Sequence, residues 1–84
     1  MKVTVRAVGG LGGAAWRWPR TFDLPDGAPL ACLLLRLDEP LRAELAQPNV
    51  IIVVNGRRVD LRTQDHLLLA DGDTVALVAA SAGG

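Results

Sequence analysis

The sequence predicts an α+β fold in which a mixed β-sheet packs on one main helix. Two predicted hairpins flank a leucine-rich helical segment, and the crossover between them is expected to join parallel strands. Half of the 84 residues are hydrophobic. A single domain of this length can therefore form a core without a metal ion or a disulfide.

The first hairpin is predicted at the start of the chain. Residues 2–8 alternate between polar and apolar side chains, with Val3 and Val5 on one face, as in a half-buried strand. The glycine cluster at 9–13 predicts a turn or flexible loop, and residues 16–24 are expected to form the second strand. A phosphate-binding loop at these glycines is disfavoured, because a helix would have to follow it.

Two helices are expected next. Pro29 suits the first turn of a helix, because its φ is already helical and it has no N–H to leave unpaired. This main helix is predicted over residues 30–37. Its apolar face consists of Leu30, Leu33, Leu34 and Leu37. A shorter helix is predicted over residues 40–46, with Leu41 and Leu45 facing inward.

The second half of the chain predicts three strands. Residues 50–54 are a continuous β-branched run, which indicates a central strand covered on both faces. Asn55-Gly56 is the strongest short-range signal for a tight hairpin, so the chain is expected to turn back through residues 57–61. Asp71-Gly72-Asp73 predicts another turn before a final strand at residues 74–78.

Composition limits the partners and the compartment. Nine basic and nine acidic side chains cancel, so no strong field draws the chain to nucleic acid or to an anionic membrane. No segment has the form of a signal peptide or the length to span a bilayer. Cys32 is the only cysteine and cannot form an internal disulfide. We therefore expect a soluble, cytoplasmic protein.

The last residues of the sequence are expected to carry the chemistry. We expect a domain over residues 1–80 and a flexible diglycine tail over residues 81–84, because residues without Cβ form a thin segment that can enter a narrow channel. The α-carboxylate of Gly84 is ionised at neutral pH and is a poor electrophile. Adenylylation by ATP would supply a good leaving group, and attack by a sulfur nucleophile would then give a thiocarboxylate.

Several short motifs, in this order along nearly the whole chain, resemble the MoaD/ThiS family of sulfur carriers. The motifs are Val3-Thr4-Val5-Arg6, Asp23-Leu24-Pro25-Asp26-Gly27, Leu33-Leu34, Val53-Val54-Asn55-Gly56-Arg57, Leu69-Ala70-Asp71-Gly72-Asp73-Thr74-Val75 and Ala82-Gly83-Gly84. The chain departs from the family at Pro29, where members often have a Thr or Ser N-cap. It also departs in the loop at 9–13 with Trp16 and Trp18, which is longer and more aromatic.

The resemblance implies a ubiquitin-like β-grasp fold and a carrier rather than an enzyme. It implies that Gly84 is the site of adenylylation and of the thiocarboxylate, with Gly83 entering the channel of the partner. No bound cofactor or metal is expected, and ATP is used by an adenylyltransferase of the ubiquitin-activating type. The first choice of sulfur acceptor is the large subunit of molybdopterin synthase, because the helix at 40–46 and the length resemble that branch.

Three other functions stay open from the sequence. The chain could be a protein modifier joined through Gly84 to lysine amines of a target. It could donate sulfur to the thiamine thiazole or to another sulfur-containing metabolite. It could also be a binding module whose sheet docks a partner while the last residues play no part.

The remaining reactive side chains have ordinary structural interpretations. Cys32 lies in the leucine-rich helix, where a free cysteine is most often a small core residue. His66 is the only histidine and is expected at the surface. Asp71 and Asp73 are explained by turn chemistry without a cation.

Two further pairs of side chains are interpreted by their position. Trp16 and Trp18 are expected on one strand face, and the sequence leaves open whether they pack in the core or bind a partner. Arg57 and Arg58 follow the hairpin turn, where exposed charges are common. An acidic patch on the activating enzyme is the alternative role for them.

Overall fold

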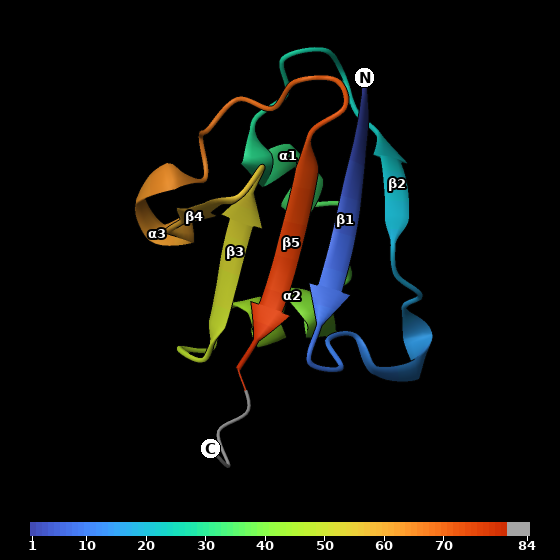
Figure 1. Ribbon diagram of the computed structural model, residues 1–84, viewed down its shortest axis with the longest axis vertical. Helices are drawn as coiled ribbons and strands as arrows, with labels where there is room; N and C mark the ends of the chain where they lie inside the picture. The colour runs from blue at the N-terminus through green and yellow to red at the C-terminus, as the bar shows by residue number, and fades with distance from the viewer. Residues whose placement is uncertain (81–84) are drawn as a thin grey trace.

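The computed structural model describes residues 1–80; the predicted tail at 81–84 lies outside the described residues. The elements follow one another around the molecule as Figure 1 shows. They are β1 (Lys2–Val8), the short 3-10 turn η1 (Gly13–Ala15), β2 (Arg20–Asp23), α1 (Leu30–Leu34), α2 (Glu39–Leu45), β3 (Val50–Val54), β4 (Arg57–Val59), α3 (Leu61–Gln64) and β5 (Thr74–Ala79).

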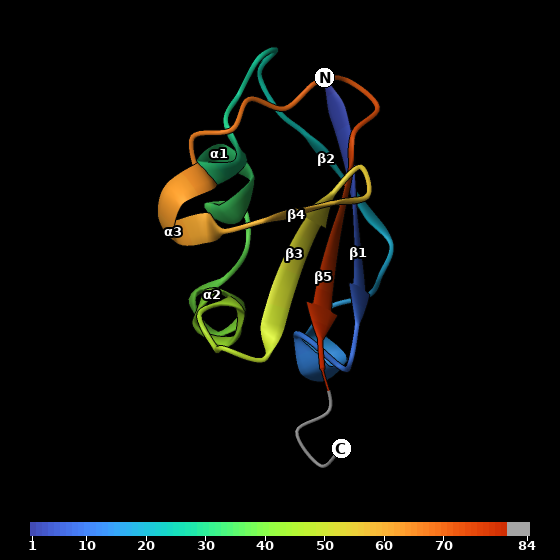
Figure 2. The same ribbon diagram turned by 60° about the vertical axis from the view of Figure 1, so that its left-hand side comes forward.

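The strands form one five-stranded mixed sheet in the order β2-β1-β5-β3-β4. β1 and β5 are parallel, whereas the other neighbouring pairs are antiparallel. The helices lie on one side of the sheet and leave its other face open (Figure 2). The predicted α+β class and the parallel crossover are therefore confirmed.

The core lies between the sheet and the helices. Alternate residues of the central strands face inward, so Val3, Val5 and Val75 have no exposed surface. Two leucines of the helical layer, Leu30 and Leu33, are buried against them. Full burial of one such aliphatic side chain contributes about 1.5–3 kcal/mol, so this layer contact is the main source of stability.

The main helix is shorter than predicted and begins differently. Pro29 is its N-cap in extended conformation (φ −74°, ψ 163°), with no side-chain acceptor. The amides of Leu30 and Ala31 instead donate to the carbonyls of Leu67 (2.7 Å) and Asp65 (2.8 Å). Backbone oxygens of the segment before β5 thus satisfy N–H groups that a Ser or Thr cap would otherwise serve.

The second helix follows closely on the first. After α1 ends at Leu34, a turn carries Leu37 into the core, where it is 2% exposed. Asp38 then caps α2, because its carboxylate accepts a hydrogen bond from the amide of Leu41 (3.0 Å). Leu41 and Leu45 are buried as expected. The helical layer therefore consists of two short helices rather than one long helix.

The second strand was predicted too long, because Trp16 and Trp18 lie outside it. Pro19 has no N–H for the ladder, and pairing with β1 begins at Arg20. The two indoles stack with their ring centroids 5.3 Å apart, and they pack partly buried against the core. Their N–H groups donate to the carboxylate of Asp38 and to the carbonyl of Leu11.

The second hairpin forms where the sequence predicts it. Asn55 and Gly56 have positive φ angles of 49° and 84°, as a two-residue hairpin turn requires. The return strand ends at Val59 rather than continuing to residue 61. Asp60 then caps the unpredicted helix α3, because its carboxylate accepts from the amide of Arg62 (3.0 Å).

Candidate functional site

Ala80 is the last described residue, and its position determines where the chain leaves the sheet. It follows β5 directly, and β5 is the middle strand of the sheet. The amide of Ala80 donates to the carbonyl oxygen of Asn49 (2.8 Å). In return, Nδ2 of Asn49 donates to the carbonyl oxygen of Ala80 (3.0 Å). Asn49 therefore forms a hydrogen bond with each of the two polar groups of the Ala80 backbone.

The bond from Asn49 takes the place of a ladder bond. Val50 pairs with Ala79 in the antiparallel register, so Asn49 stands opposite Ala80. The donor to Ala80 is the side-chain amide of Asn49 rather than its backbone N–H. Pro48 precedes it and has no N–H, so it cannot donate to a further rung. The last ladder pair between β3 and β5 is Val50 with Ala79.

Gly9 confines β5 from its other side. Its φ is +97°, which disfavours any residue with a side chain. A Cβ atom here would lie 2.5 Å from the carbonyl oxygen of Ala79 and 2.8 Å from its Cβ, which is too close. Gly9 therefore lets the loop after β1 approach the end of β5. Asn49 and Gly9 together hold the chain immediately before residue 81.

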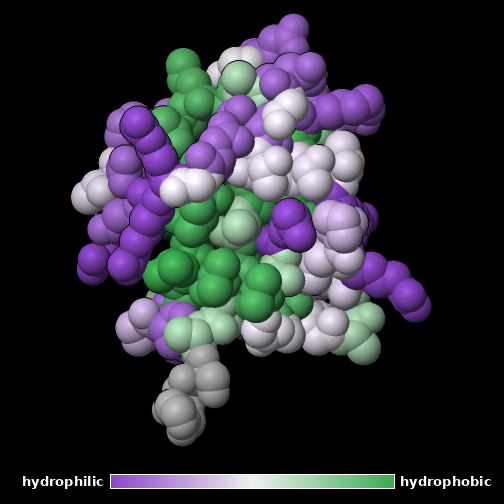
Figure 3. Space-filling view, viewed as in Figure 1, coloured by the Kyte–Doolittle hydropathy of each residue, from purple (hydrophilic) through white to green (hydrophobic). Residues whose placement is uncertain are grey.

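The uncovered face of the sheet carries an apolar patch that leads toward Ala80. In the register, Ile51 lies beside Val78, Val53 beside Ala76, and Val8 beside Val78. Val8 is 61% exposed, and the other four are half-buried. We call Val8, Ile51, Val53, Ala76 and Val78 the outer apolar face. Figure 3 shows hydrophobic side chains gathered over this part of the sheet.

Arginines border the outer apolar face. Arg6 pairs in register with Ala76, and Arg58 pairs with Val53. Both arginines are exposed.

The prediction that β3 is covered on both faces is wrong, because the helices cover only one side and leave Ile51 and Val53 half-exposed. An apolar centre with charged margins is the usual composition of a protein interface.

The two residues predicted to carry the chemistry, Gly83 and Gly84, lie outside the described residues. Cys32 is half-buried on α1 and packs against the core, as a small core residue would. His66 is exposed, with Nδ1 3.8 Å from the Asp65 carboxylate. The structure brings neither side chain to the end of β5, which is bordered by Asn49 and Gly9.

The aspartate side chains of the turn before β5 accept hydrogen bonds from backbone amides. Asp71 accepts from the amide of Lys2 (2.6 Å), and Asp73 accepts from the amide of Ala70 (2.8 Å). The side chain of Asn55 donates to Asp73 and accepts from the amide of Thr74, which links the hairpin turn to the start of β5. These contacts agree with the turn interpretation of the aspartates.

An exposed ion pair joins the first two strands near this turn. Nζ of Lys2 lies 2.8 Å from the carboxylate of Asp23. The hydrogen bond and the opposite charge raise the pKa of Lys2 and lower the pKa of Asp23. Both groups stay charged at neutral pH. Such a pair orients β1 against β2 but contributes little to stability because it is solvated.

The site includes residues that the sequence did not single out. Asn49 has no local signal beyond its place after a proline and before a β-branched run. The outer apolar face has a weak signal in residues 50–54, where every second side chain must point away from the core. Gly9 is part of the glycine cluster at 9–13, but its contact with Ala79 depends on the pairing of β1 with β5.

Comparison with protein families decides the relationship. The model of the ThiS family matches residues 15–84, which include every strand and helix from β2 to β5. The chain belongs to the ThiS family. This membership confirms the resemblance to the MoaD/ThiS sulfur carriers. The matched region also runs through Gly83 and Gly84.

Solved structures share the fold of this ThiS-family chain. SAMP1 from Haloferax volcanii is 18% identical, with a TM-score of 0.75 and 100% of both chains covered. A putative molybdopterin converting factor, subunit 1, from Pyrococcus furiosus is 25% identical, with a TM-score of 0.66 over 95% of this chain and 98% of that chain. These likenesses confirm the ubiquitin-like β-grasp fold.

A third similar structure contains a partner. It is the protein-protein complex of subunits 1 and 2 of the molybdopterin-converting factor from Helicobacter pylori, 23% identical, with a TM-score of 0.59 and 100% of both chains covered. A search of curated proteins finds no significant match. Within residues 1–80, none of the helices is long and apolar enough to cross a membrane.

Proposed function

We propose that this ThiS-family chain is a sulfur carrier whose Gly84 carboxylate is converted to a thiocarboxylate. The observation that carries the proposal is the family match through Gly84, on a fold that holds the preceding chain at Ala80. Partner enzymes bind the folded domain, and these enzymes perform the chemistry. The protein is therefore a carrier and a substrate rather than an enzyme.

The reaction proceeds in two steps at one carbonyl. In the first step, a carboxylate oxygen of Gly84 attacks the α-phosphorus of ATP, and pyrophosphate leaves. In the second step, hydrosulfide delivered by a partner attacks the glycyl carbonyl, AMP leaves with the bonding electron pair, and loss of a proton gives the Gly84 thiocarboxylate. The absence of a side chain at Gly83 and Gly84 keeps this carbonyl accessible.

An adenylyltransferase of the ubiquitin-activating type is the first partner. Its binding surface is expected to cover the outer apolar face, because that face leads to Ala80 and is apolar at its centre. Arg6 and Arg58 at the margin favour a partner that is acidic there. ATP is bound by the enzyme, and the carrier itself requires no cofactor. We place both proteins in the cytoplasm.

Molybdopterin synthesis is the proposed destination of the sulfur. The names of the similar Pyrococcus furiosus and Helicobacter pylori proteins support this choice, as does the presence of a second subunit in the latter structure. The large subunit of molybdopterin synthase is then the acceptor. Conjugation to lysines begins from the same adenylate, so the nucleophile that the partner presents distinguishes a donor from a modifier. Donation to a thiazole differs only in the acceptor.

Reconstitution tests this function. The full chain is incubated with the ubiquitin-activating-type adenylyltransferase of its own host, ATP and sulfide, and pyrophosphate release is measured. We expect release with the parent chain and none when Gly84 is deleted or when one residue follows it. Both variants should unfold at the parent's denaturant midpoint. Normal adenylate formation by the extended variant would refute the role of Gly84.

A further inference from the structure

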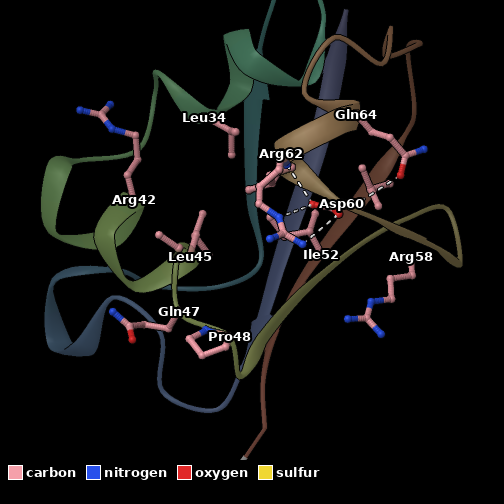
Figure 4. A pocket seen from close by; sticks show the side chains of 13 residues that line it. Leu34, Arg42, Leu45, Gln47, Pro48, Ile52, Arg58, Asp60, Arg62 and Gln64 are labelled. Atoms are coloured by element: carbon pink, nitrogen blue, oxygen red, sulfur yellow. Dashed lines mark hydrogen bonds and ion pairs between the residues drawn. The ribbon is translucent and has the colours of Figure 1, made fainter.

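A groove lies on the helical side of the sheet and shares only Arg58 with the margin of the outer apolar face. It has a volume of about 820 Å³ and lies between α2, the β3–β4 hairpin and α3. Figure 4 shows side chains from these elements around it. Neither Ala80 nor any residue of the outer apolar face lines the groove. A molecule bound in it would therefore leave Ala80 and the outer apolar face accessible and would meet their surroundings only at Arg58.

The floor of the groove is apolar. Leu45, Ile52 and Val59 form its buried part, and each is less than 10% exposed. Leu34 and Leu61 are half-buried and add accessible apolar surface. The groove is open to solvent rather than enclosed. Small molecules bind in pockets that cover most of their surface, so an open apolar trough suits a segment of polypeptide better.

Three arginines from three different elements border this floor. Arg42 comes from α2, Arg58 from β4 and Arg62 from α3 (Figure 4). We call the feature the arginine groove. Arg42 donates one hydrogen bond to the carbonyl of Leu37 (2.9 Å), which uses one of its five N–H groups. Its remaining N–H groups, and those of Arg58, make no hydrogen bond or ion pair with residues 1–80 in the structure.

Asp60 is the only acidic residue among those that line the groove within residues 1–80. Its carboxylate accepts from the amide of Arg62 (3.0 Å) and forms an ion pair with the Arg62 guanidinium (3.4 Å). These contacts lower the pKa of Asp60, so it stays ionised and paired. Arg42 and Arg58 then leave the groove positive, although the chain as a whole has no net charge.

We propose that the arginine groove binds an acidic segment of a partner protein in which carboxylates flank apolar side chains. Leu, Ile or Val side chains would cover the floor, and the planar guanidinium groups would each hold a carboxylate through two parallel hydrogen bonds. Nucleic acid fits the groove poorly, because no aromatic side chain for base stacking is among its described lining residues. This inference does not depend on the chemistry of Gly84.

The probe is a synthetic peptide, acetyl-Glu-Asp-Leu-Val-Asp-Leu-Glu-amide, titrated into the full isotope-labelled chain while amide chemical shifts are recorded. We expect saturable shifts at Ile52, Val59 and Leu61. A second peptide has Lys in place of every acidic residue, and a third has Ser in place of every apolar residue. Both should bind at least tenfold more weakly, because the second peptide lacks the carboxylates for the arginines and the third lacks the apolar side chains for the floor.

Two charge-reversal variants locate the binding. Arg58→Glu should lower the affinity for the acidic peptide at least tenfold. Arg6→Glu changes the net charge equally but lies three strands away in the sheet, about 14 Å at the usual strand spacing and beyond a Debye length of about 8 Å in 0.15 M salt. It should alter the affinity less than twofold. Both arginines are exposed, so both variants should retain the dispersed spectrum of the folded chain.

Four outcomes would overturn the proposal. They are no shifts at the groove with millimolar acidic peptide, equal binding of the lysine peptide, equal weakening by the two variants, and shifts confined to the outer apolar face. The last outcome would assign the peptide to the sheet surface instead. Activation at Gly84 is measured separately, so a negative result here leaves the sulfur-carrier function intact.

Discussion

Single residues decide how the chain reaches the end of the sheet. Asn49 bonds to both backbone groups of Ala80, and Gly9 admits a backbone approach that a Cβ atom would block. Neither residue takes part in the proposed reaction. Their role is to limit the directions that the chain can take after Ala80. This lowers the entropy lost when the following residues enter the active site of a partner that already holds the sheet.

Replacing Asn49 tests this positioning role. Asn49→Ala removes the Nδ2 bond but keeps the backbone bond, so the stability loss should stay below about 1 kcal/mol. Ordering one freed residue costs about 1–2 kcal/mol, so kcat for adenylate formation should fall about tenfold with KM unchanged. Amide relaxation should show faster motion at Ala80. The matched control is Gln47→Ala, since the Gln47 side chain makes no hydrogen bond within residues 1–80.

An unchanged kcat in Asn49→Ala, together with increased motion at Ala80, would show that this hydrogen bond does not assist the reaction. A rise in KM alone would indicate that Asn49 contacts the enzyme directly. Either result would leave the reaction at Gly84 unaffected, because the reconstitution experiment tests that reaction independently.

Gly83 is expected to tolerate little added volume. Gly83→Val places a β-branched side chain beside the reacting carbonyl, which both widens and stiffens the segment. We expect kcat/KM for adenylate formation to fall at least tenfold, with no change in the free energy of unfolding. Ala82→Val introduces the same side chain one residue earlier and should have a smaller effect. Equal activity of Gly83→Val and the parent would exclude a narrow channel at this position.

At the scale of elements, the two faces of the sheet have different tasks. The inward face of β1, β3 and β5 packs on α1 and α2, whereas the outward face keeps apolar side chains half-exposed. Apolar side chains in contact with solvent contribute little to folding. They are available for burial against a partner, and β5 connects this face directly with Ala80.

The outer apolar face should contribute to binding of the adenylyltransferase. Val8→Asp introduces a charge at a 61% exposed position of β1, so the fold should tolerate it. We expect calorimetry to show binding weakened by more than about 1 kcal/mol, as for an interface hot spot. Leu35→Asp is the matched control, because Leu35 is 73% exposed and follows α1 on the other layer. Equal affinities of the two variants would place recognition elsewhere, with Trp16 and Trp18 as the next candidates.

The stacked indoles beside β2 should act in folding. Trp18 packs partly buried on Trp16, and its Nε1 donates to the carbonyl of Leu11 (3.1 Å). Trp18→Ala should therefore lower the free energy of unfolding by about 2–3 kcal/mol, somewhat less than for a fully buried aromatic residue. Trp18→Phe should recover part of this loss. A urea titration that shows less than 0.5 kcal/mol for Trp18→Ala would instead favour a partner surface.

Across the whole molecule, the strands and turns that depend on the neighbouring sequence are predicted well. The alternation over residues 2–8 and the β-branched run at 50–54 give strands with these bounds. Asn55-Gly56 forms the expected turn, because Gly has no steric penalty at positive φ and Asn only a small one. The parallel crossover also follows from the order of hairpins and helices.

The features that the sequence does not predict depend on contacts between segments that are distant along the chain. Residues 16–19 leave the predicted strand because the indoles find partners at Leu11 and Asp38. The main helix begins without a side-chain cap because carbonyls near residue 66 approach it. The hydrogen bonds of Asn49 depend on the register between β3 and β5, which no local pattern encodes. Gly83 and Gly84 were predicted from the sequence alone and stay a prediction.

The sulfur-carrier function is tested most directly by mass spectrometry of the intact chain purified from its native host. We predict a population in which one oxygen is replaced by sulfur, with fragment ions that locate the change at Gly84. Fragmentation is essential, because oxidation of Met1, Cys32 or a tryptophan changes the mass by nearly the same amount. A chain recovered mainly as conjugates through Gly84 to target lysines, with no thiocarboxylate detectable, would contradict the sulfur-carrier function.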